Sequence, residues 1–359
     1  MRHPLLFYYR AYARSRLGAS RAADIASEVG RDLAEGAASS PVLDILPFRR
    51  EEVAVLEYAA RANPRDAVAS YLLGSLLWAL GRKAEALSAW RQACAGDRPE
   101  FVAFRALGLA EIEQDNFDAG LRALARAVEL APEDISTGLL LAQFYAQRDR
   151  SREAEAVLER LPADEDRVVE RRAALEAQQG RWAQAAELLR THTFQPQHLS
   201  RSLLNLYREI HLGWGAEEQR RGEATAAAAK FAAAAEPPAG LGADDFPGPP
   251  GARVLVFQQR WELAAASDAA DPEETFFRAV ALARLGRGQQ ARPLLEAVRE
   301  SADRLEQSAK REGRALGLYL RGLLARHAGQ DAAARDAFRR ALAEDATLLS
   351  ARVELARLP

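Results

Sequence analysis

One spacing recurs along this 359-residue chain: a glycine is followed by a small residue five positions later and by a large apolar residue nine positions later. Gly81, with Ala86 and Trp90 at these offsets, begins the clearest copy. Four further copies begin at Gly180, Gly222, Gly286 and Gly329. Glycine is the usual residue at the left-handed end of a helix, and a small residue lets a neighbouring helix approach closely. The spacing therefore predicts helical hairpins joined by glycine turns.

The helix before each turn also repeats. Gly74 and Gly108 each follow a leucine and lie 34 residues apart, and Ala142 lies another 34 residues on. Pro99 and Pro132 each end a unit. These features resemble the tetratricopeptide repeat, which has 34 residues in two antiparallel helices. The resemblance implies an all-α, tetratricopeptide-repeat-like right-handed superhelix (an α-solenoid) of about seven helical hairpins, whose concave face binds partners.

The predicted organisation has four parts. An N-terminal helical hairpin and connector occupy 1–47, a first array 48–236, a Pro/Gly loop 237–253, and a second array with a closing helix 254–359. The loop contains Asp244, Asp245 and Phe246, and both a flexible linker and an ordered loop stay open for it. The predicted units are 67–98, 101–132, 135–162, 166–191, 199–235, 272–300 and 315–346.

Composition excludes several classes of protein. The formal net charge is −2, so the chain has no bulk attraction for nucleic acid or for an anionic membrane. No stretch reaches the roughly 18 consecutive apolar residues of a membrane span, and the N-terminus lacks the pattern of a signal peptide. A single cysteine, Cys94, excludes an internal disulfide. A cytoplasmic location is the expectation.

Catalytic and metal-binding patterns are weak. His192, His198 and His211 lack the helical i, i+3 or i+4 spacing of metal ligands. Cys94 lies near a predicted helix C-terminus with no histidine beside it, which does not favour a reactive thiolate. The chain also lacks a phosphate-binding glycine loop. We therefore expect no enzymatic activity, no metal and no cofactor.

The first helix of each unit offers the candidate binding surface. In tetratricopeptide repeats, positions 2, 5, 9 and 12 of this helix usually line the groove. A largely apolar groove with aromatic residues and arginine suits a protein or peptide partner. Packing of some of these side chains between units is the alternative. The candidate partner-binding residues are Tyr71, Trp78, Arg105, Leu109, Ile112 and Gln143.

The aromatic N-terminal stretch "LLFYYRAY" raises a second question. It places Phe7, Tyr8, Tyr9 and Tyr12 within two helical turns. These rings either receive a partner domain or a second copy of the chain, or they are buried against the hairpin at 20–37. Oligomerisation through stacked array ends is a further open alternative.

A narrower resemblance begins at "LPFRREEVAVLEYAARANPRDAVASYLLGSLLWALGRKAEALSAWRQA" and continues through "FVAFRALGLAE" and "LLRTHTFQPQH". These segments are similar to the helical region of an uncharacterised bacterial family. In that family, tetratricopeptide repeats follow a β-sandwich domain related to the galactose-mutarotase superfamily. Where the family has an acidic, glycine-containing stretch, this chain has "FQPQHLS", so a family role for that segment is not carried over.

The leading functional hypothesis is a non-catalytic scaffold for protein–protein interaction through the concave face. The resemblance implies a carbohydrate-active β-sandwich domain as one partner, although the sequence itself contains no such domain. The alternative is a helical accessory part of a carbohydrate-binding or carbohydrate-processing protein. In that case, the loop at 237–253 and the segment "THTFQPQH" contribute to the sugar site.

Overall fold

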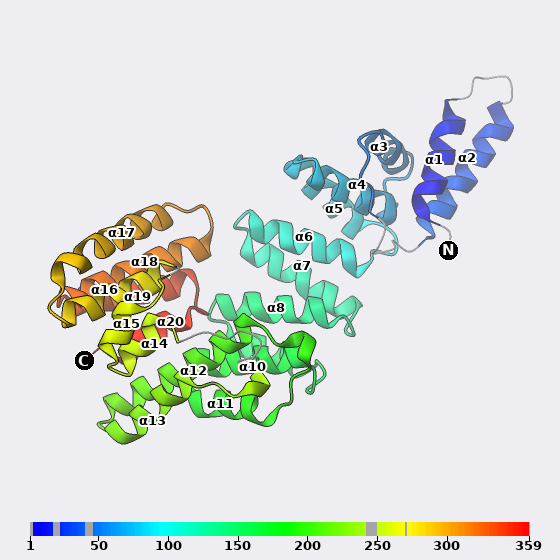
Figure 1. The fold of residues 1–359 in the computed structure, drawn as a ribbon. Coiled ribbons are helices and arrows are strands. Elements are labelled where there is room, and N and C mark those ends of the chain that lie inside the picture. The colour runs from blue at the N-terminus through cyan, green and yellow to red at the C-terminus, as the bar shows by residue number, and fades with distance from the viewer. Residues whose placement is uncertain (1–2, 17–21, 40–45, 242–249, 270, 359) are drawn as a thin grey trace. The chain divides into compact units, whose positions relative to one another are not determined.

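The computed structural model describes residues 3–16, 22–39, 46–241, 250–269 and 271–358 (Figure 1). These residues form helices and connecting turns, with no β-strand among them. The chain divides into two compact units, 1–141 and 142–359.

Unit 1 contains an N-terminal hairpin, a single helix and then consecutive hairpins. The last helix, α8, begins in unit 1 and ends in unit 2. The helices are α1 (Pro4–Ser15), α2 (Ala22–Ala37), α3 (Glu52–Ala62), α4 (Ala67–Ala79), α5 (Lys83–Ala95), α6 (Phe101–Glu113), α7 (Phe117–Leu130) and α8 (Ile135–Gln147).

Unit 2 continues with paired helices and ends in a single helix, α20. Its helices are α9 (Ser151–Leu158), α10 (Asp166–Gln178), α11 (Trp182–Thr191), α12 (Arg201–Arg220), α13 (Ala224–Ala235), α14 (Ala252–Phe257), α15 (Trp261–Ala266), α16 (Pro272–Arg284), α17 (Gly288–Glu306), α18 (Arg311–His327), α19 (Asp331–Glu344) and α20 (Leu349–Ala356). We call the first helix of each hairpin the A helix and the second the B helix.

The predicted glycine turns are confirmed. All five turn glycines have a left-handed backbone, with φ between 73° and 84°. In the first turn, Gly81 N–H donates to the carbonyl of Trp78 at 3.0 Å, and Arg82 N–H donates to the carbonyl of Leu77 at 2.9 Å. This pair of hydrogen bonds is the Schellman motif, which satisfies the last carbonyls of the A helix.

Three other turns have the same geometry without glycine. Asp115, Asp149 and Gln259 have φ between 57° and 61°. The turn at Gln259 joins α14 to α15, and Arg260 N–H closes it on the carbonyl of Leu255 at 2.9 Å. This hairpin is an eighth one that the sequence analysis did not predict. Its α14 begins at Ala252, inside the predicted loop, whereas Asp244, Asp245 and Phe246 lie outside the described residues.

The Leu-Gly pattern of the A helices marks close helix contacts, as predicted. A Cβ atom on Gly74 would lie 2.6 Å from Cδ1 of Trp90, which is too close for a real contact. Gly215 stands in the same relation to Phe231, at 2.4 Å from its Cε1. Glycine in the A helix therefore makes room for the large residue of the B helix in the same hairpin.

The N-terminal hairpin is tied to the array within unit 1. Tyr8 is fully buried, lies over Gly36 of α2, and donates its hydroxyl to Asp66 Oδ2 at 2.8 Å. Asp66 is also the N-cap of α4 and accepts from Ala69 N–H at 2.9 Å. Of the two alternatives for the N-terminal rings, Tyr8 therefore follows burial within the N-terminal hairpin, and its hydroxyl also bonds the start of the first repeat.

The last helix, α20, packs against α19 and also against the A helices α10, α12 and α18 of unit 2. Its contact residues include Ala351 and Val353, which are fully buried. Repeat arrays usually bind their partners on the A-helix side. In unit 2, part of that side is therefore covered by the chain's own final helix. No helix in the described segments is long and apolar enough to cross a bilayer.

Candidate functional site

The candidate partner-binding residues of unit 1 do not form one uniform surface. Tyr71 of α4 is only 8% exposed, and Arg105 of α6 lies close enough to act electrostatically on its hydroxyl. Burial raises the pKa of Tyr71, and Arg105 opposes this effect. Arg105 is 32% exposed and lies 3.8 Å from the carboxylate of Asp134, just before α8. Tyr71, Arg105 and Asp134 thus lie at or near the starts of α4, α6 and α8, with Arg105 in contact with Asp134 and in the electrostatic range of Tyr71.

Leu109 extends this group of residues. It follows Arg105 by four residues on α6, so both side chains lie on one face of the helix, and Leu109 is half-buried. Asp134 accepts from Thr137 N–H at 3.1 Å, which fixes its carboxylate at the start of α8. We call Tyr71, Arg105, Leu109 and Asp134 the unit 1 strip. It combines an arginine and a carboxylate with apolar and aromatic neighbours.

Trp78 and Ile112 contact their B helices instead. The ring of Trp78 lies 5.4 Å from that of Trp90 on α5, and the ammonium of Lys83 lies 5.1 Å from its centroid. Ile112 lies directly against Gly120 of α7, because a Cβ on that glycine would come within 2.5 Å of it. Both side chains therefore contribute to packing within their own hairpins.

Gln143 belongs to unit 2, where it is half-buried. Its amide oxygen accepts from Arg171 Nη2 of α10 at 3.2 Å. This contact joins the A helices of two successive hairpins.

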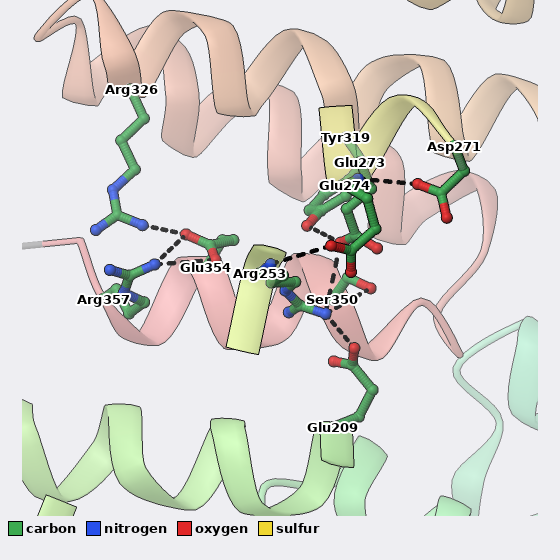
Figure 2. A network of polar contacts seen from close by, with 10 residues as sticks. All are labelled: Glu209, Arg253, Asp271, Glu273, Glu274, Tyr319, Arg326, Ser350, Glu354 and Arg357. Atoms are coloured by element: carbon green, nitrogen blue, oxygen red, sulfur yellow. Dashed lines mark hydrogen bonds and ion pairs between the residues drawn. The ribbon is translucent and has the colours of Figure 1, made fainter. Parts of the chain in front are cut away.

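A polar network that no pattern in the sequence indicates links α20 to the A helices of unit 2 (Figure 2). Its centre is Arg253 of α14, which is 3% exposed. The Arg253 guanidinium donates to Glu209 of α12, lies 3.4 Å from Glu273 of α16, and reaches Ser350 of α20 at 3.5 Å. Tyr319 of α18 donates its hydroxyl to Glu273. Five helices therefore meet at one buried cation.

A second cluster lies further along α20. Glu354 is fully buried and accepts from Arg326 of α18 and from Arg357, the latter at 3.2 Å (Figure 2). Burial opposes ionisation of Glu354, but Arg357 and Arg326 hold the pKa of its carboxyl below the ordinary value. Glu354 is therefore an anion shared by two guanidinium groups.

Three histidines of unit 2 pack against other residues of the fold. His192 Nε2 lies 2.7 Å from Asp166 of α10, and His198 Nε2 lies 4.0 Å from the same carboxylate. His211 lies against Tyr207, and burial together with Lys230 lowers its pKa to about 4.

Burial raises the pKa of Cys94 to about 12. Since the thiolate is the reactive form of cysteine, its surroundings do not activate it at neutral pH. Across the described ranges, no three His, Cys, Asp or Glu side chains are grouped so that they could hold a metal ion.

Comparison with known proteins agrees with the geometry of the hairpins. The family model described as tetratricopeptide repeat matches residues 111–178, from the end of α6 to the end of α10. No curated protein sequence matches the chain.

Among solved structures, a tetratricopeptide repeat protein from Parabacteroides merdae is 14% identical, with a TM-score of 0.38, and the match covers 98% of this chain and 99% of that one. The Naa15/Naa10 complex bound to HypK-THB gives 14% identity and a TM-score of 0.42, with 95% of this chain and 63% of that chain covered. MamA gives 17% identity and a TM-score of 0.28, with coverage of 51% and 84%. The described residues form helical hairpins, and the tetratricopeptide-repeat family model matches those between 111 and 178.

Proposed function

We propose that the protein is a non-catalytic scaffold that binds a protein segment on the A-helix face of unit 1, at the unit 1 strip. The observation that carries this proposal is the half-exposed Arg105 beside Tyr71 and Leu109. Arginine and aromatic side chains dominate the energy of protein interfaces. Helical repeat arrays bind partners on this side.

The A helices of unit 2 are partly covered by α20, which supports placing the binding surface on unit 1. In unit 2, α20 packs on α10, α12 and α18 and is held there by the buried contacts of Arg253 and Glu354. A partner would have to displace this helix to reach the same A helices. The strip in unit 1 requires only that Arg105 exchange its 3.8 Å contact with Asp134 for a carboxylate of the partner.

The chemistry of the strip defines the partner. Arg105 suits an acidic side chain, and Leu109 suits an apolar side chain about one helical turn away. We therefore propose a short acidic and apolar segment of another protein as the ligand. The β-sandwich partner implied by the sequence resemblance stays a prediction, to be tested with such a domain once the segment is known.

A random linear peptide library displayed on phage and selected on the intact chain tests this proposal. Selected peptides should combine Asp or Glu with an apolar residue. Arg105→Glu should weaken their binding at least tenfold, whereas Arg126→Glu, on the exposed face of B helix α7, should leave it unchanged. Failure to select any peptide, or equal binding by both variants, would refute the proposal.

A further inference from the structure

A pocket in unit 2 lies beside the Glu354 cluster and has no part in the proposed scaffold function. It has a volume of about 390 Å³ and is formed by residues of α14, α15, α16, α18 and α20. This volume falls in the range of small-molecule sites, about 300–1,000 Å³. The pocket lies within one unit, and its lining residues come from helices that contact one another directly.

The walls of the pocket are apolar and largely aromatic. Trp261 of α15, Phe276 and Val280 of α16, and Leu323 of α18 line it. Phe276 and Leu323 are buried members of the core of unit 2, whereas Trp261 and Val280 are half-buried. The walls are therefore fixed by packing, and they offer a flat apolar ligand a surface that is already formed.

The charges at the pocket are predominantly positive. Arg326, Arg357 and Arg284 line it together with a single carboxylate, Glu354. Glu354 is ionised but already accepts from Arg326 and Arg357. Arg284, at 5.8 Å from the centroid of Trp261, adds a third guanidinium. Three cations and one anion leave an excess of positive charge next to an apolar wall.

Among the described hydrogen bonds, the guanidinium groups of Arg326 and Arg357 each donate from a single nitrogen. Arginine carries five N–H donors, and both Arg326 and Arg357 contact Glu354 through Nη1. A hydrogen bond from a guanidinium group to a carboxylate is charge-assisted and about twice as strong as one between neutral groups.

We propose that this pocket binds a small organic carboxylate with a flat apolar body. The body lies between Trp261, Phe276 and Val280, and the carboxylate accepts from Arg326 and Arg284. A neutral molecule of the same shape would fill the pocket but leave the excess positive charge unbalanced. A bare inorganic anion would balance the charge but gain nothing from the walls.

Isothermal titration calorimetry of the intact chain with 2-naphthoate tests the proposal, with 2-naphthamide as the neutral analogue and acetate as the carboxylate without a body. We expect 2-naphthoate to bind at least tenfold more tightly than either control. Equal affinities for the acid and the amide, or no binding of 2-naphthoate, would overturn the proposal.

Variants locate the site. Val280→Phe fills the pocket without changing a charge, and Arg284→Gln removes an exposed cation whose described contact is the ring of Trp261. Both variants should weaken the binding of 2-naphthoate at least tenfold, and circular dichroism should show an unchanged helix content. Arg299→Gln, whose side chain pairs with Glu296 outside the pocket, is the matched control and should bind as the native chain does. Binding that survives Val280→Phe would place the acid elsewhere and overturn the assignment.

Discussion

Arg253, the second residue of α14, donates a hydrogen bond from its guanidinium group to the carboxylate of Glu209 on α12, 44 residues earlier in the chain. The same guanidinium reaches Ser350 of α20, 97 residues later. One buried side chain thus connects three separate segments of unit 2.

Replacing Arg253 by leucine should destabilise unit 2 strongly. The change leaves the carboxylates of Glu209 and Glu273 without their buried cation, and breaking a buried ion pair costs about 3–5 kcal/mol. Urea denaturation followed by circular dichroism measures the free energy of unfolding. Arg340→Leu removes an exposed contact with Asp336 and should change this free energy by less than about 0.5 kcal/mol. Equal effects of the two variants would contradict the central role of Arg253.

Stability should depend on pH through Glu209. Burial raises the pKa of Glu209 to about 7, whereas an unfolded glutamate titrates near 4.3. The folded state therefore binds this proton more tightly. The resulting stabilisation is complete below about pH 4.3 and is lost as the pH rises through 7.

Glu209→Gln removes this titration while keeping the shape of the side chain. The melting temperature of the native chain relative to that of Glu209→Gln should fall between pH 5 and pH 8. Differential scanning fluorimetry across this range measures the difference between the two chains. A constant difference would show that Glu209 has the same pKa in the folded and unfolded states.

Tyr8→Phe should destabilise unit 1. The variant loses the 2.8 Å hydrogen bond from the hydroxyl to Asp66, and a hydrogen bond to a charged group contributes about 1.5–3 kcal/mol. Tyr12→Phe removes a hydroxyl that contacts only the exposed Arg16 at 3.0 Å among the described hydrogen bonds, and it should cost less than about 0.5 kcal/mol. Urea denaturation of both variants makes the comparison, and a similar cost for both would argue against anchoring by Tyr8.

Alanine at two helical glycines should have opposite effects. Gly74→Ala places a Cβ against the ring of Trp90, and overpacking of this kind costs about 1–3 kcal/mol. Gly30 of α2 has no heavy atom within 4 Å of an added Cβ, so Gly30→Ala should stabilise its helix by up to about 1 kcal/mol. Thermal unfolding of both variants tests the assignment. Stabilisation by Gly74→Ala would contradict the close approach of α4 and α5.

The hairpins and their turns could be predicted from the sequence because the causes are local. Gly81 and its equivalents mark the left-handed turn, and Gly74 marks the close contact with Trp90. The hairpin at Gln259 escaped prediction because its two helices have only six residues each, and the first begins inside the proline- and glycine-rich stretch at 237–253. The repeated dipeptide Arg-Trp, at 181–182 and again at 260–261, was the signal that could have revealed it.

The candidate sites were less predictable than the fold. Tyr71 and Arg105 are neighbours because their helices are adjacent repeats. Trp78, by contrast, lies against Trp90 within its own hairpin. A rule based on position in the A helix does not separate side chains that face the groove from side chains that pack against the B helix. The contacts of Arg253 join residues 44 and 97 positions apart, and no periodicity in the sequence encodes such distant pairs.

Photo-crosslinking tests the proposed function most directly. A benzophenone amino acid is placed at position 109 on α6 or at position 126 on the exposed face of α7, and each intact chain is irradiated with the peptide selected on the native protein. If the peptide binds on the A-helix face, position 109 should give a covalent adduct and position 126 should give none. An adduct from position 126 alone, or equal yields from both positions, would contradict binding at the unit 1 strip.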